Sequence, residues 1–589
     1  MFSGQCSARP LGDACYQRER LRVGDRRSGI ARTVTIHYSL LIIALSLPFV
    51  LWGVCGILPT FDDYTTLQSP QFTPLWSEGL LPNNGFWRPF DYLFGWLLGR
   101  FTWLFPWFNH VVIIVGHTLS TLLVYSICRR LSLGTMGAHV ATLFFFFSPA
   151  TLGATLAVDG LNQTYAQFWG LVALTLYLRT TSFPRCVFFF LLAALSKENG
   201  LAWAVVLPLV AFAFGLNDKK RTLRHVFYGL LFIVLYIVVR VMLNPHQTVG
   251  EEYLATTPLE HLKDVLQLLV YTWLPVDYAS IVYAPARCWP LAIATLLLAL
   301  PFIVYLIYKG GLQITKGERQ RTTLCLLTLL ACYFILAAPH LLTVASIMHN
   351  YAPLSMAALI VASLISPSIA KASPGKGRFL LRQASLGAER GVGSVACKAI
   401  ILGFFLAMLI TDVHHLQAAR ASGQLSRQMA MEVIDSLSPS SHDLGIPKRF
   451  ARPRVDEQRS GMARTVNGPL GPLGTLATSG KGYGSATEGL ESQERSMVNV
   501  FCISVSSTDD MPGYSSFYVR PVDAFAWGLS VRHYTHYQYP AQLRDTTLSN
   551  PTPNELRHVA DSALNAGASS VWIVTDSCYH VSVYTNSQF

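Results

Sequence analysis

Long apolar runs separated by short polar stretches dominate the chain from residue 36 onwards. A helix needs ~20 mostly apolar residues to cross the ~30 Å hydrocarbon core of a bilayer, and most of the runs reach that length. The pattern therefore predicts a mainly α fold, a polytopic membrane helical bundle of about eleven spans. The runs are 36–57, 108–128, 137–157, 161–178, 186–195 with 200–215, 225–243, 288–308, 322–345, 350–368 and 397–412.

Composition supports a membrane location for most of the chain. Of the 589 residues, 51% are hydrophobic and only 13% are charged, and the mean hydropathy is +0.37. A soluble domain carries roughly a quarter charged residues. A large part of this chain is therefore expected to lie in lipid.

The net charge of +12 is concentrated in alternate polar stretches, as the positive-inside rule describes for cytoplasmic loops. This distribution disfavours nucleic acid as a partner, and it predicts a cytoplasmic N-terminus and an outer C-terminal tail. Because both flanks of 186–215 are basic, this segment is predicted to be a hairpin with "SKEN" (196–199) at its outer tip. The basic stretches are the N-terminal arm, Arg129/Arg130, Arg179/Arg185, Lys219/Lys220/Arg221/Arg224, Lys309/Lys316/Arg319/Arg321 and Lys371/Lys376/Arg378/Arg382.

Four regions follow from these patterns. The tail contains a stretch rich in Gly, Ser and Pro with no apolar period, which is typical of a linker. After it, "MVNVFCISVS" and "SSVWIVT" predict strands, and "PTPNELRHVADSALNAG" predicts a helix between Pro and Gly. The predicted regions are a basic cytoplasmic arm (1–35), a transmembrane body (36–415) with outer loops 58–107 and 244–287, a largely disordered linker (416–495) and a small extracytoplasmic α/β domain (496–589).

Two adjacent carboxylates, Asp62 and Asp63, stand in "FDD" just after the first apolar run. One interpretation is a polar exit from the membrane. The other is catalytic chemistry at the membrane surface, since a carboxylate there can serve as general base on an acceptor hydroxyl. A divalent metal on the pair is a further possibility, for which Asp159 is the one other nearby carboxylate; an obligatory metal is not expected.

Further ionisable residues fall in or beside stretches that the topology places on the same outer side. Such groups are costly near lipid and are usually paired or functional. Their position at one face, rather than at the midplane, disfavours a transporter. Simpler roles remain open: an ion pair at the hairpin tip, an arginine that extends to the interface, and buried histidines. The candidates are Arg88, Asp159, Lys197, Glu198, Arg240, His340, His349 and Tyr351.

Three of these segments resemble the polytopic glycosyltransferases of the GT-C class: "FDD", "WRPF" in the first outer loop and "LLAALSKENGLAWAVVLPLV" in the hairpin. The chain is most similar to the branch that includes protein O-mannosyltransferase-like enzymes and the bacterial lipid A aminoarabinose transferase. "MHNYAPLSMAALI" is similar to a family stretch before a late span. The chain departs from the family pattern at "SPATLGATLA", where members often carry "HP", and it lacks the tetratricopeptide repeats of some members.

This resemblance implies a GT-C-like body at about residues 36–370, with Asp62 or Asp63 as base. Lys197 is implied to contact a lipid phosphate, and Arg240 and Arg88 are expected near the donor. Asp159, Glu198, His340, His349 and Tyr351 are candidates for substrate binding.

The expected activity is transfer of a sugar, with inversion, from a polyprenyl-phosphate carrier to a glycan, lipid or protein acceptor. It would take place at the outer face of a membrane, the bacterial inner membrane by the type of family resembled. No obligatory cofactor is expected, and the partners are the lipid-linked donor, the acceptor and membrane lipids. Two alternatives stay open: a transporter or flippase of lipid-linked sugars, and a non-catalytic protein of envelope assembly.

Overall fold

The computed structural model describes two separate units. The helical unit is described at 39, 41–59, 63, 87–90, 93, 107–157, 160–243, 257–276, 285–315, 319–341, 347–366 and 395–425, and the unit that contains the sheet at 426–437, 499–506, 542–549, 551–568, 570–575 and 581–584. The predicted basic arm and most of the predicted linker lie outside these residues.

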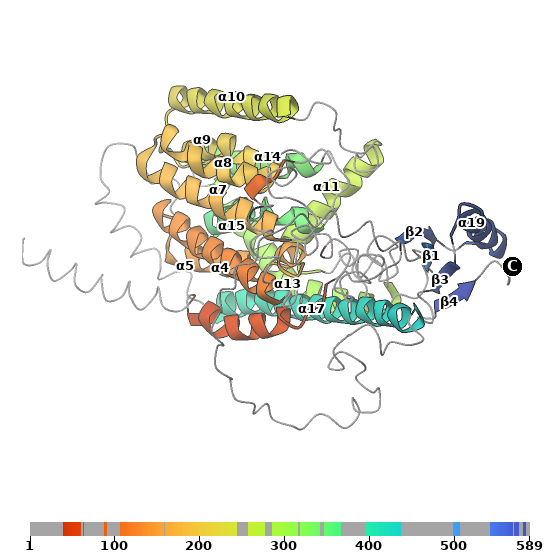
Figure 1. Ribbon diagram of the computed structural model, residues 1–589. Helices are drawn as coiled ribbons and strands as arrows, with labels where there is room; N and C mark the ends of the chain where they lie inside the picture. Colours follow the sequence, from red (N-terminus) through yellow and green to blue (C-terminus); the bar gives the residue numbers. More distant parts are fainter. Residues whose placement is uncertain are drawn as a thin grey trace, which may run out of the picture. The chain divides into compact units, whose positions relative to one another are not determined.

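Helices form nearly all of the first unit (Figure 1). Each predicted apolar run carries at least one of them. The helices are Leu41–Val54, α4 (Trp107–Arg130), α5 (Thr135–Phe147), α6 (Leu152–Thr155), α7 (Leu161–Thr180), α8 (Val187–Ser196), α9 (Trp203–Ala213), α10 (Lys219–Leu243), α11 (Pro258–Trp273), α13 (Pro285–Thr315), α14 (Arg319–Leu341), α15 (Leu354–Ile365) and α17 (Val395–Leu437), with 3₁₀ turns at η2 (Pro149–Thr151), η4 (Pro184–Cys186), η5 (Glu198–Ala202) and η7 (Ile347–Tyr351).

Within the described residues, five helices are long and apolar enough to cross a membrane, or six if a bent pair counts as one span. The protein is thus mostly helical, with membrane-capable helices. Several expected spans, among them α8, α9 and α15, form helices shorter than the ~20 residues a crossing requires, so about eleven spans stays a prediction. The five long helices are Trp107–Arg130, Lys219–Leu243, Trp289–Gly311, Gln320–Pro339 and Val395–Arg420.

The run 137–157, predicted as one span, is broken in the structure and bent by 46° between α5 and the segment Pro149–Thr155. Ser148 is extended, with φ −68° and ψ 130°, as expected of a residue that precedes proline. Its side chain accepts a hydrogen bond from the Ala150 N–H and so starts the next turn.

Two further boundaries differ from the predictions. Helix α17 continues to Leu437, past residue 415, where the linker was expected to begin; residues 416–437 contain no proline and only one glycine, Gly423, so nothing there ends a helix. The predicted outer loop 244–287 contains helix α11, which packs on the unit through the buried Tyr271 and Thr272.

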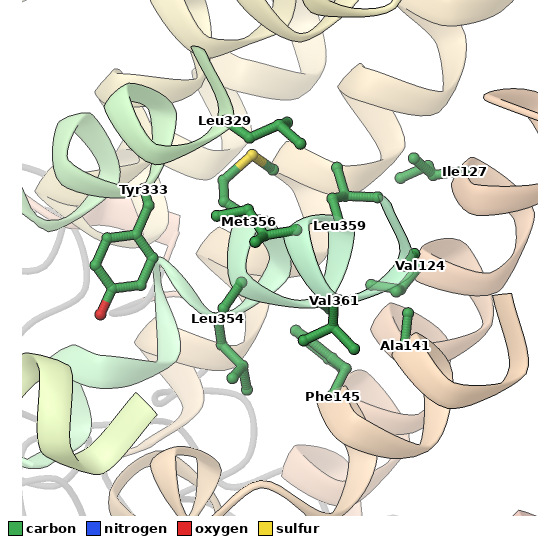
Figure 2. Packing of buried hydrophobic residues seen from close by; sticks show 14 of the residues in the cluster. Val124, Ile127, Ala141, Phe145, Leu329, Tyr333, Leu354, Met356, Leu359 and Val361 are labelled. Atoms are coloured by element: carbon green, nitrogen blue, oxygen red, sulfur yellow. The ribbon is translucent and has the colours of Figure 1, made fainter. Parts of the chain in front are cut away.

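Helix α15 lies at the centre of the core (Figure 2). It is buried along nearly its whole length and packs against α4 and α5 on one side and α14 on the other. Met356, Leu359 and Val361 are among the residues that fill this space. Helix α10, in contrast, packs mainly against α9 along one edge of the unit and leaves most of its apolar residues exposed, as suits a lipid-facing helix.

The second unit is a four-stranded sheet of order β2-β1-β3-β4 with one helix. Strand β1 (Asn499–Ser506) is parallel to β2 (Gln542–Ser549) and β3 (Ser570–Thr575), and β4 (Val581–Tyr584) is antiparallel to β3. Helix α19 (Pro553–Asn565) begins at a capping box and packs its apolar face on the strands. Its extracytoplasmic location stays a prediction.

Candidate functional site

The hairpin tip predicted from "SKEN" is a sharp reversal between α8 and η5. Lys197 ends α8 in extended conformation, with φ −157° and ψ 150°. Gly200 then lies directly against α8: a Cβ built on it would be 2.2 Å from the backbone carbonyl of Ala193. Only glycine allows so close an approach. The turn therefore holds Lys197 and Glu198 between elements that are far apart in the sequence.

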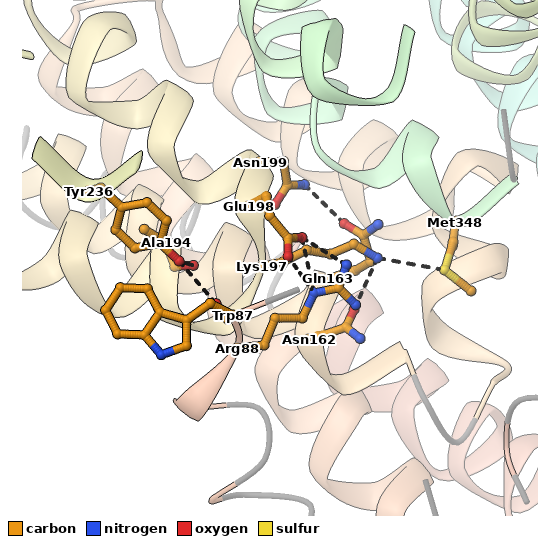
Figure 3. Close-up of polar contacts among 10 residues, drawn as sticks. All are labelled: Trp87, Arg88, Asn162, Gln163, Ala194, Lys197, Glu198, Asn199, Tyr236 and Met348. Atoms are coloured by element: carbon orange, nitrogen blue, oxygen red, sulfur yellow. Dashed lines mark hydrogen bonds and ion pairs between the residues drawn. The ribbon is translucent and has the colours of Figure 1, made fainter. Parts of the chain in front are cut away.

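Glu198 forms an ion pair with Arg88 of the first outer loop (Figure 3). The Arg88 Nε donates to both carboxylate oxygens at 3.0 Å, and Nη2 donates to Oε2 at 2.7 Å. The two side chains are 19% and 20% exposed. Burial alone would raise the pKa of Glu198, but the Arg88 charge and its hydrogen bonds hold this pKa below its ordinary value.

Lys197 is 4% exposed, and its chain runs from the hairpin towards α7 and η7. Its Nζ donates to the Asn162 Oδ1 at 3.3 Å and lies 3.9 Å from the Met348 Sδ. Next to this pair, the Asn199 Nδ2 donates to the Gln163 Oε1 at 3.0 Å. The start of α7 thus presents two amides that hold the hairpin tip.

Helix α10 closes the other side of the cluster. The Tyr236 hydroxyl lies 3.0 Å from the Trp87 carbonyl oxygen and 3.3 Å from the Ala194 carbonyl oxygen, and either of them can accept its one hydrogen. The centre of its ring lies 5.1 Å from the centre of the Trp87 ring. Arg240 follows one helical turn later, on the same face of α10. The predicted donor-binding residue Arg240 is therefore near the hairpin, on the face of α10 that carries Tyr236.

The segment η7 brings His349 to the same cluster. Burial, together with the positive charges of Lys197 and Arg88, lowers the pKa of His349 well below its ordinary value. The ring is thus neutral at physiological pH. A neutral imidazole here can donate one hydrogen bond and accept another.

Tyr351 was predicted as a substrate-binding candidate, and the structure places its side chain in the core. It is fully buried, and its hydroxyl lies 2.9 Å from the His117 Nδ1. The His117 Nε2 lies 3.2 Å from the Phe146 carbonyl, which can only accept, so Nε2 carries the hydrogen and Nδ1 accepts from Tyr351. Tyr351 thereby fixes the end of η7 to α4.

The predicted carboxylates are described only in part. Asp63 is 4% exposed, whereas Asp62 and Asp159 lie outside the described residues, as does the side chain of His340. Among the side chains that the structure describes, no three of His, Cys, Asp and Glu gather closely enough to hold a metal ion. Which of Asp62 and Asp63 could serve as base therefore stays a prediction.

Sequence reasoning did not assign a role to Asn162, Gln163, Asn199, Tyr236 or His117. A signal for three of them was present: Asn162, Gln163 and His117 are polar residues within apolar runs, where such groups are costly unless they have partners. Asn199 and Tyr236 carry no such signal, because a tip asparagine and a span tyrosine are both ordinary.

Comparison with known proteins gives one similarity. No protein-family model matches the chain, and no curated protein does. Among solved structures, the crystal structure of ArnT from Cupriavidus metallidurans bound to undecaprenyl phosphate is similar, with 13% sequence identity and a TM-score of 0.35 over 67% of this chain and 80% of that one.

Proposed function

We propose that this chain is a GT-C-like membrane glycosyltransferase that moves a sugar from a polyprenyl-phosphate carrier to an acceptor at the outer face of the membrane. The observation that carries the proposal is Lys197. Its ammonium is almost completely buried at a hairpin tip, beside Arg88 and the neutral His349. Burial of a charge costs free energy, and a binding site for a lipid phosphate explains why a charged lysine is buried at this position.

In the proposed reaction, Asp62 or Asp63 takes the proton from an acceptor hydroxyl, and the oxygen attacks the anomeric carbon of the donor sugar. The bond from this carbon to the phosphate oxygen breaks, and its electron pair leaves with the polyprenyl phosphate. The configuration inverts because attack and departure occur on opposite faces. Lys197 and Arg240 stabilise the charge on the phosphate, and Arg88 orients the hairpin through Glu198.

One observation favours the flippase alternative. Transporters often place broken helices at their substrate site, and the segment from α5 to α6 is bent by 46°. A flippase would also use cations for the phosphate, but it would not need a carboxylate base. The two functions therefore differ in what an Asp variant does.

The test uses the full chain in lipid nanodiscs with a panel of polyprenyl-phosphate sugars, and it follows both donor binding and sugar release. Wild type is compared with Asp62→Asn, Asp63→Asn and Lys197→Met, with Lys220→Met as a matched control because Lys220 is an exposed lysine of α10. We expect one donor to be consumed, a loss of ~10² or more in rate for one Asp variant, and weaker donor binding for Lys197→Met alone.

Other results refute parts of the proposal. Donors that bind but are never consumed, equally in wild type and both Asp variants, argue for a flippase or another carrier-handling protein. Donor binding that is unchanged in Lys197→Met removes the phosphate role of the hairpin.

A further inference from the structure

An apolar groove of about 420 Å³ lies between helices α13, α14, α15 and α17, with α5 and the end of α11 at its deep end. All of its lining residues are apolar side chains or glycines, and none belongs to the Lys197 cluster. Its volume is in the range of ~300–1,000 Å³ that is usual for ligand pockets. Trp273 and Phe302 lie in its lining, as do Ile307, Gly310, Gly311 and Leu364.

The groove opens on a face of α13 that suits lipid. Ile307 lines the groove and is 71% exposed, and Leu297 and Val304 on the same helix are 63% and 54% exposed. Trp289–Gly311 of α13 is one of the membrane-capable segments, as are parts of α14 and α17. The medium at the opening is therefore expected to be hydrocarbon, and an apolar cavity does not hold water.

The glycine pair keeps one end of the groove open. A Cβ on Gly310 would be 3.1 Å from the Leu364 Cδ2, whereas a Cβ on Gly311 would meet nothing within 4 Å. Lys309 comes directly before this pair, and its Nζ lies 5.7 Å from the centre of the Tyr305 ring. A cation thus lies one residue from the lining of an apolar groove, which is an arrangement that suits one lipid with an anionic headgroup.

We propose that this groove binds one acyl chain of a bilayer phospholipid, with the lipid phosphate at Lys309 and the end of the chain near Trp273. One observation favours this lipid over the polyprenyl carrier. Leu364 lies near the opposite end of α15 from η7, which contacts Lys197; ten residues of helix separate Leu354 from Leu364, ~15 Å along the axis. A carrier whose phosphate is at Lys197 would enter the groove from its other end.

The test is quenching of tryptophan fluorescence by brominated lipids. The full chain is placed in nanodiscs of phosphatidylglycerol with bromine either near the end of one acyl chain or near the headgroup. The signal of Trp273 is the quenching in wild type that is missing in Trp273→Phe. We expect this signal to be larger for bromine near the chain end, because the headgroup lies at Lys309.

Gly311→Leu extends a side chain into the open end of the groove and is expected to abolish the Trp273 signal. Ala294→Leu adds a side chain of the same kind on an exposed position of α13 and is expected to leave it unchanged. A melting temperature near that of wild type shows that each variant is folded.

Three results would overturn the proposal. One is a Trp273 signal that is absent, and another is a signal that is equal in Gly311→Leu and Ala294→Leu. The third is a signal that is stronger for bromine near the headgroup and is removed by added polyprenyl phosphate, which would assign the groove to the carrier instead. None of these outcomes depends on the glycosyltransferase proposal.

Discussion

The ion pair between Arg88 and Glu198 makes a specific prediction about stability. Glu198→Gln keeps the size of the side chain and removes its charge, and Arg88→Gln removes the charge of the partner with a shorter side chain. The double variant removes both charges. A double-mutant cycle of wild type and these three variants isolates the energy of the pair from the other contacts of each residue.

The structure brackets the size of the effect. Exposed ion pairs contribute ~0–1 kcal/mol, whereas removal of one partner from a fully buried pair costs ~3–5 kcal/mol. With exposures of 19% and 20% and three N–O contacts of 2.7 to 3.0 Å, this pair lies between these limits. We expect each single variant to lose ~2 kcal/mol, close to the value of a hydrogen bond to a charged group.

The assay is unfolding by SDS in mixed micelles, with the free energy of unfolding compared among the four proteins. The double variant is expected to lose less than the sum of the two single variants, by ~1–2 kcal/mol, because the second substitution has no ion pair left to break. Strictly additive losses would refute the reasoning, since they would mean that the contact in Figure 3 contributes nothing to stability.

Three further predictions concern the pH dependence at Glu198, two glycines and the hydroxyl of Tyr351. Because the pKa of Glu198 is lowered on folding, its stabilisation is present above the ordinary value of 4.5 and is lost as the pH falls through the lowered pKa; the difference in melting temperature between wild type and Glu198→Gln should therefore vanish in acid. Gly200→Ala should destabilise by ~1–3 kcal/mol because its Cβ meets the Ala193 backbone, whereas Gly311→Ala, in open space, should stabilise by up to ~1 kcal/mol, both measured by unfolding. Tyr351→Phe should cost ~1–3 kcal/mol in the same assay, since it leaves the buried His117 Nδ1 without a donor.

The helical character of the chain could be predicted because apolar runs are long and polar stretches are short. The structural details that the sequence did not predict have local causes. Pro149 divides a run that hydropathy alone reads as continuous, and α17 continues because residues 416–437 have no strong helix breaker. Helix α11 was missed because charged residues break up its apolar run along the sequence, and its burial becomes visible only when Tyr271 meets the core.

The contact between Arg88 and Glu198 could not be predicted, since 110 positions separate the two residues and neither segment contains a pattern that indicates the other as its partner. The hairpin tip itself was predictable from the basic flanks of 186–215. Tyr351 shows a different limit, because the sequence suggested a role for it but did not reveal its buried contact. A sequence similarity placed it among substrate-binding candidates, but the nearby His117 provides a buried partner that only the packing of α4 against α15 and η7 reveals.

Lys197 decides between a structural and a functional account of the cluster, because the two accounts predict opposite effects of one substitution. Lys197 and Glu198 are neighbours, yet the extended backbone at Lys197 points their side chains in different directions. Lys197 contacts Asn162 and Met348, and Glu198 contacts Arg88. If Lys197 serves only stability, Lys197→Met should destabilise the fold, because it removes the donor to Asn162 and the positive charge next to Glu198, and donor binding by the folded protein should not change. If the ammonium binds the phosphate, the same variant should keep its fold and lose donor binding. Unfolding and donor binding measured on this one protein, beside Lys220→Met, therefore separate a lysine that the fold requires from a lysine that the reaction requires.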